Sequence, residues 1–161
     1  MTSGMLFWIA VAATLATGLA NFGQRSLRNF SRRMLEEVCR ARGNLDRFGH
    51  VLREHERVAL GVEHLASVAA GIALAAWFGW FEVRRTADGA LTYGELASFA
   101  ALAAVMLIAT RTWFPWTGER LFAEKFLYLT WPVWKAAAVG AAPLTWSTHF
   151  GDALMHRLFG R

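Results

Sequence analysis

Three long apolar runs dominate the pattern of the chain, and polar, arginine-rich stretches separate them. The runs cover about residues 5–23, 58–81 and 94–113. A helix of roughly 20 apolar residues crosses the hydrocarbon core of a bilayer. A soluble fold of 161 residues, 55% of them hydrophobic, would lack the polar surface to cover these runs. The pattern therefore predicts an all-α, polytopic membrane protein with three transmembrane helices in contact with the lipid bilayer.

A fourth apolar stretch, residues 126–150, contains Pro132 and Pro143. Proline inside a helix removes a backbone hydrogen bond and kinks or breaks the helix. This stretch is therefore either a broken fourth span or a segment that lies in the membrane interface. We expect a kinked juxtamembrane helix in the interface over residues 117–150, followed by a short C-terminal amphipathic helix over residues 151–161.

The polar stretches between the runs predict shorter elements. Residues 24–57 carry apolar positions at helical spacing on both sides of Gly43–Asn44. We expect a pair of short amphipathic helices there, separated by a turn at the glycine. Asp88–Gly89, between the second and third runs, predicts a tight turn. The whole chain, residues 1–161, is then a single membrane domain.

Basic residues are distributed unevenly about the apolar runs. The net charge is +5, and nine arginines lie between the first and second runs: Arg25, Arg28, Arg32, Arg33, Arg40, Arg42, Arg47, Arg53 and Arg57. Positive residues beside membrane spans favour the cytosolic side. This predicts a protein of the cell (inner) membrane with its N-terminus outside, and with residues 25–57 and the C-terminus in the cytosol. The distribution explains the charge without nucleic acid, for which the sequence has no motif.

Tryptophans recur in pairs spaced by three residues, which places both rings of a pair on one helix face. The pairs are Trp77 and Trp80, Trp113 and Trp116, and Trp131 and Trp134. Tryptophan favours the headgroup region of a bilayer, and the first two pairs stand at the ends of predicted spans. We therefore interpret these six residues as interface anchors.

Two ionisable residues lie inside the second run, where a charge is costly and marks a functional candidate. Glu63 lies one helical turn from Ser67, so both side chains could face a cavity. Alternatively, Glu63 reaches the inner surface or pairs with an arginine there. His64 alone cannot hold a metal ion, because two or three further ligands would be needed.

Small and polar residues share one face of the first run: Thr14, Thr17, Gly18 and Asn21. Such a face either packs against another helix or lines an ion path. No motif of a known catalytic site or phosphate-binding loop occurs. The single cysteine, Cys39, excludes a cysteine-clustered zinc site. We therefore expect that the protein is not an enzyme and holds neither a cofactor nor a metal site.

The order of these elements resembles the transmembrane domain of the CNNM/CorC family of divalent-cation transporters, also called hemolysin-like proteins. Residues 27–35 resemble the stretch that follows the family's first span. Residues 119–127, with Pro143 beyond them, resemble its juxtamembrane helix. The resemblance implies an outer N-terminus, three spans, a cytosolic helix pair and dimerisation. We expect no CBS domain within these 161 residues.

The resemblance also places the family's metal-handling motifs on this chain, where most of the ligands are replaced. The Ser-x-Ser-Glu pattern falls on Asn21 to Gln24, and the Asn of the second span falls on Ala70. Of the Gly-Glu-x-x-Pro-Lys motif only Pro115 remains. Mg²⁺ prefers oxygen ligands, usually carboxylates, and these motifs have lost theirs. Only the resemblance therefore implies Mg²⁺ for this chain. The candidate ion-path or polar intramembrane residues are Asn21, Gln24, Glu63, His64, Ser67 and Pro115.

Two functions follow as expectations. In the first, the chain takes part in divalent-cation (magnesium) transport through a homodimer, or through a heterodimer with a related membrane protein that keeps the ligands. In the alternative, it is a non-transporting membrane interaction or structural protein that has lost the cation site.

Overall fold

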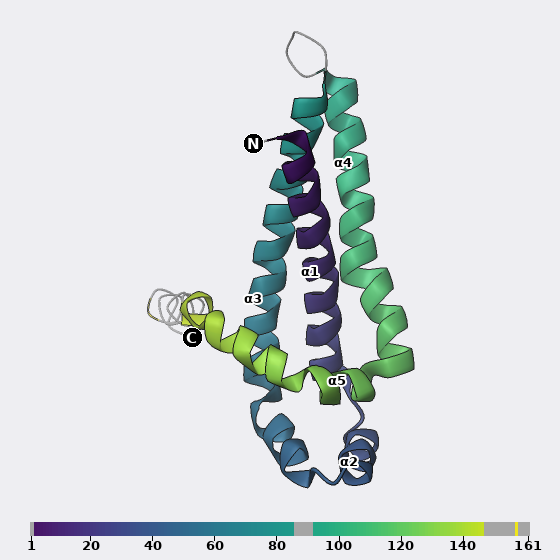
Figure 1. Cartoon of the computed structure of the whole chain (residues 1–161), viewed down its shortest axis with the longest axis vertical. Helices are drawn as coiled ribbons and strands as arrows, with labels where there is room; N and C mark the ends of the chain where they lie inside the picture. The colour runs from purple at the N-terminus through teal and green to yellow at the C-terminus, as the bar shows by residue number, and fades with distance from the viewer. Residues whose placement is uncertain (1, 86–91, 147–156, 158–161) are drawn as a thin grey trace.

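Every described element of the chain is a helix (Figure 1). A computed structural model describes residues 2–85, 92–146 and 157. The elements are α1 (Ser3–Asn29), α2 (Arg32–Ala41), α3 (Leu45–Arg84), α4 (Tyr93–Ile108), the π-helix η1 (Ala109–Trp113) and α5 (Phe114–Gly140). The predicted all-α fold is confirmed. The expected turn at Asp88–Gly89 and the expected C-terminal helix, apart from Arg157, lie outside the described residues.

Three of the described helical segments are long and apolar enough to cross a membrane. They are Ser3–Asn29, Leu45–Arg84 and the joined segment Tyr93–Gly140. Each contains one of the predicted spans, and α1, α3 and α4 run alongside one another in Figure 1. The lengths and compositions of these helices confirm the prediction of a membrane protein with three candidate spans.

Two residues form the turn between α2 and α3. Gly43 has a φ of 65°, which glycine adopts without steric cost, and it follows the end of α2. Asn44 caps α3, because its Oδ1 accepts a hydrogen bond from the backbone N–H of Arg47 at 3.1 Å. The predicted break at Gly43–Asn44 is therefore present. The second amphipathic helix is not separate, however, because no proline interrupts residues 45–84 and α3 is continuous.

α1 and α3 are antiparallel neighbours and contact each other more extensively than any other pair of the described helices. Small side chains are buried along both helices, with Ala10 and Ala20 on α1 and Ala66 and Ala73 on α3. Helices that present small side chains approach each other closely, so dispersion contacts hold them together even without a hydrophobic driving force.

The third candidate span runs without interruption from α4 through η1 into α5. Pro115 follows η1 in the first turn of α5, and the N–H that proline lacks leaves a carbonyl of the preceding turn without its helical partner. Figure 1 shows α5 crossing α1 near its lower end, and α3 above its lower end, instead of running antiparallel to them. As far as Gly140, residues 126–150 therefore form no fourth bundle helix. The helix runs from Phe114 to Gly140 instead of the expected 117–150, and Pro132 lies inside it without ending it.

The apolar core lies where the end of α1, α2, the first half of α3 and α5 meet, a region that we call the junction. Its fully buried side chains include Leu27, Leu35, Cys39, Val51, Val62 and Leu127. By contrast, α4 has no buried residue. The junction therefore holds α5 against the bundle, while α4 is the least covered of the bundle helices.

Candidate functional site

A polar cavity of about 240 Å³ lies between the last turns of α1 and the π-helix η1. Five of its lining residues come from α1, at the spacing that puts them on one helix face, and the sixth comes from η1. These are Asn21, Gln24, Arg25, Arg28, Asn29 and Arg111. We call this site the arginine cavity. No residue in its lining carries a carboxylate.

Two of the three arginines pair with carboxylates of other helices. Arg25 donates to Glu119 of α5 through its Nε. Arg28 donates through Nη2 to Oε2 of Glu63 on α3, at 2.6 Å. The Arg111 side chain makes no hydrogen bond or ion pair with any residue that the structure describes. An arginine side chain stays charged at any physiological pH, so the cavity carries an unbalanced positive charge.

Asn21 places a buried, unsatisfied donor beside these arginines. The residue is 8% exposed, and its Nδ2 has no hydrogen-bond partner among the described residues. Leaving a buried donor unsatisfied costs about 1–3 kcal/mol. The Nδ2 atom is closed to water, whereas the cavity is open to it, so this unpaired donor does not face the cavity.

The polar residues of the second span are occupied by local partners. Glu63 pairs with Arg28, which is one of the two alternatives that the sequence left open. The Ser67 hydroxyl donates to the Glu63 carbonyl at 3.1 Å. His64 Nδ1 lies 2.7 Å from the Leu60 carbonyl oxygen. The described residues contain no group of three His, Cys, Asp or Glu side chains that could hold a metal ion.

The small and polar face of α1 packs against other helices. Thr14 Oγ1 accepts a hydrogen bond from Trp77 Nε1 of α3 at 3.0 Å. Thr17 is buried and donates to its own helix, at the carbonyl of Ala13. Gly18 faces the ring of Phe114. From Thr14 to Gly18 this face therefore packs against other helices, as the first alternative predicted. Of its four residues, only Asn21 lines the arginine cavity.

Pro115 contributes no polar group to the site. It is buried at the start of α5, directly after η1. Its position indicates a role in packing. The structure therefore places Asn21 and Gln24 together in the arginine cavity, and Pro115, Ser67 and His64 outside its lining.

The tryptophan pairs have different surroundings. Trp113 and Trp116 are 59% and 45% exposed, as interface anchors require. Trp131 and Trp134 are buried in the junction, so their interpretation as anchors is wrong. The reason is that α5 crosses the bundle and turns the face that carries this pair toward α1 and α3.

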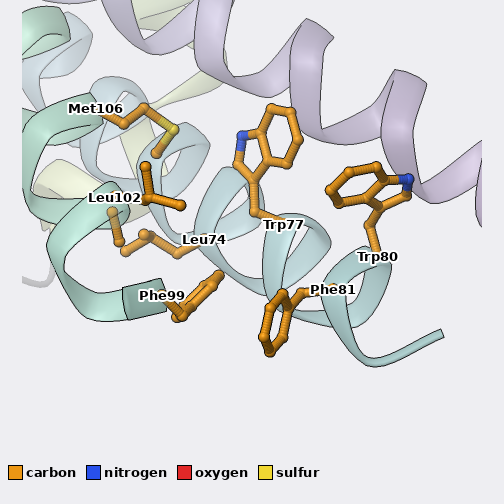
Figure 2. Close-up of a pocket in the computed structure, with 8 residues that line it drawn as sticks. Leu74, Trp77, Trp80, Phe81, Phe99, Leu102 and Met106 are labelled. Carbon is orange, nitrogen blue, oxygen red and sulfur yellow. The ribbon is translucent and has the colours of Figure 1, made fainter. Parts of the chain in front are cut away.

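Trp77 and Trp80 line a second cavity, of about 290 Å³, between α3 and α4. Figure 2 shows their indoles on α3, with Leu102 and Met106 opposite on α4. The lining is Leu74, Trp77, Trp80, Phe81, Phe99, Leu102, Ala103 and Met106. This cavity is apolar and offers no group for catalysis or for ion binding.

The sequence pattern pointed to Asn21 and Gln24 but missed the arginines as part of a site. The spacing of Asn21, Gln24, Arg25 and Arg28 on one helix face was an available signal. Arg111, which follows the apolar stretch of the third run, was a second signal. Positive charge near a span was instead attributed to topology alone.

Comparisons with known proteins identify no relative, so the interpretation rests on the residues of this chain. No protein-family model, curated protein or solved structure matches the sequence or the fold. The resemblance to the CNNM/CorC family therefore stays a hypothesis.

Proposed function

We propose that this chain is a membrane interaction domain of a multi-pass protein in the cell membrane, without a divalent-cation site of its own. The observation that carries the proposal is the lining of the arginine cavity. Asn21 and Gln24, the residues that the resemblance would put in a cation path, lie beside Arg25, Arg28 and Arg111.

Electrostatics disfavours Mg²⁺ at this place. The ion prefers a near-octahedral set of oxygen ligands, one or two of which are carboxylates in most protein sites. Here the nearest carboxylates are held by guanidinium groups, Glu63 by Arg28 and Glu119 by Arg25. A divalent cation would have to displace an arginine and would still face the positive charge of Arg111.

Calorimetric titration of Mg²⁺ and Mn²⁺ into the purified chain in detergent tests this proposal. We expect no saturable binding, either to the natural chain or to Glu63→Gln. Saturable binding that Glu63→Gln abolishes would contradict the proposal, because it would show that Glu63 leaves Arg28 to ligate a cation.

A second candidate is participation in divalent-cation transport as one half of a dimer. The observation that favours it is the exposed apolar face of α4, where Leu102, Val105 and Ile108 are 71%, 55% and 47% exposed. A further membrane helix can pack on such a face. A second copy of this chain, or a related protein that keeps the ligands, would then complete the transport unit.

Fluorescence photobleaching of single labelled chains in lipid bilayers separates the two candidates. Dimers that carry a cation flux, and that lose the flux when Val105→Trp blocks the α4 face, would favour the transport assembly. Val68→Trp, at another exposed apolar position, on α3, is the matched control. Chains without flux in any oligomeric state would favour the interaction domain.

A further inference from the structure

We propose that the arginine cavity binds a phosphate group, carried by a lipid headgroup or by free inorganic phosphate. This goes beyond the proposed interaction function, because it assigns a ligand to a site of this chain. The inference starts from the three arginines that line one cavity, because the side chain of Arg111 has no partner among the described residues.

Arg111 brings a full set of unused donors. A guanidinium has five N–H donors and no acceptor, and that of Arg111 has no hydrogen bond or ion pair within the described part of the chain. Arg25 and Arg28 use one N–H nitrogen each on Glu119 and Glu63. Their remaining N–H groups add donors around the same cavity, while the two carboxylates are already occupied.

Amide side chains complete the lining of the cavity. Gln24 and Asn29 lie beside the three arginines, and each carries an NH₂ group that can donate. The oxygens of an ionised phosphate accept hydrogen bonds. A bound phosphate would therefore satisfy the free Arg111 guanidinium through charge-assisted hydrogen bonds.

The arrangement favours phosphate over a metal ion or an apolar ligand. The donors reach the cavity from α1 on one side and η1 on the other, which suits an anion with several oxygens. Arginine matches phosphate geometry through its planar fork. Exposed Trp113 and Trp116 follow closely in sequence, and tryptophan marks the depth of the lipid headgroups. A lipid headgroup and free inorganic phosphate both present the phosphate group that this cavity would bind.

Binding to the purified chain in a maltoside detergent, which contains no phosphate, tests this inference. In one arm, inorganic phosphate is titrated by calorimetry at constant ionic strength. In the other, retention of phosphatidic acid or phosphatidylglycerol is measured by native mass spectrometry. The variant that tests the site is Arg111→Gln. The matched control is Arg32→Gln, which removes the same charge from an exposed position of α2 outside the cavity.

We expect saturable binding in at least one arm, weakened roughly ten- to a hundredfold by Arg111→Gln. Arg32→Gln should change it by less than about twofold, because an exposed charge is screened by salt. Saturation with lipid alone identifies a headgroup, and saturation with inorganic phosphate identifies a soluble anion. Either result supports the site.

Two results would overturn it. One is an absence of saturable binding in both arms. The other is an equal loss in Arg32→Gln, which would show that the positive surface attracts anions without a site. The Mg²⁺ titration described above is a separate measurement, so failure of the interaction function and failure of the phosphate site are distinguishable.

Discussion

Trp134 of α5 packs its indole directly on the backbone of α1 at Gly23. A Cβ added at Gly23 would lie 2.6 Å from Cζ2 of that ring, closer than nonbonded atoms approach. Trp134 is 9% exposed, and its Nε1 donates to Thr130 Oγ1 at 2.7 Å. The ring is therefore held in place, and the absence of a side chain at Gly23 decides where α5 crosses α1.

Replacing this glycine should destabilise the protein. In Gly23→Ala the added methyl group overpacks the junction, which costs about 1–3 kcal/mol, offset by about 1 kcal/mol because alanine is the better helix former. We expect a lower Tm in detergent. Gly71→Ala is the matched control, because nothing lies within 4 Å of a Cβ at Gly71, and its Tm should stay equal or rise. A Gly23→Ala protein as stable as Gly71→Ala would contradict the packing.

The hydrogen bond from Trp77 to Thr14 joins α3 to α1 at 3.0 Å. Thr14→Val keeps the shape of the side chain and removes the acceptor, so the indole N–H is left without a partner. We expect a loss of about 1–3 kcal/mol in the free energy of unfolding. Thr14→Ser, which keeps the hydroxyl, should lose less. Equal stability of the two variants in a denaturation experiment would show that the bond contributes nothing.

The ion pair between Arg28 and Glu63 should contribute modestly to stability. Their side chains are 51% and 41% exposed, and exposed pairs contribute about 0–1 kcal/mol. Glu63→Gln should therefore fold with a Tm close to that of the natural chain. A double-mutant cycle with Arg28→Gln measures the coupling. A coupling well above this range would assign Glu63 a structural role that the geometry does not explain.

Cys39 makes the stability of the junction sensitive to alkaline pH. Burial raises the pKa of the Cys39 thiol, and the nearby Arg47 guanidinium lowers it by a smaller amount. The folded protein therefore prefers the neutral thiol. This contribution is complete below the ordinary thiol pKa of about 8.5 and is lost as the pH rises through the higher pKa of the folded state. Between neutral and alkaline pH, the Tm of Cys39→Ala should fall less than the Tm of the natural chain. Parallel curves of Tm against pH for the two proteins would contradict this prediction.

The single cysteine also allows a direct test of orientation. In a Cys39→Ala background, Thr2→Cys and Arg57→Cys each place one exposed thiol at opposite ends of the candidate spans. If the N-terminus lies outside, as the sequence predicts, an impermeant maleimide should label Thr2→Cys on intact cells. Arg57→Cys should react only after permeabilisation. The reverse labelling would invert the proposed topology and place the arginine cavity outside.

Local sequence carried the information for the spans and for the turn at Gly43–Asn44. The hydropathy of a run is a property of neighbouring residues, and so is the conformational freedom of a glycine that ends a helix. The three apolar runs therefore predicted α1, α3 and α4. The continuity of α3 was missed, because an amphipathic stretch and an apolar stretch can belong to one helix when nothing between them breaks it.

Only the tertiary structure decided the direction of α5 and the composition of the arginine cavity. The spacing of Trp131 and Trp134 describes a helix face, but it does not say whether lipid or protein covers that face. In the same way, no local pattern joins Arg111 to Asn21, which are far apart in sequence and meet because η1 packs beside the end of α1. Contacts between distant segments depend on how helices cross, and that crossing is fixed by close approaches such as the one between Gly23 and Trp134.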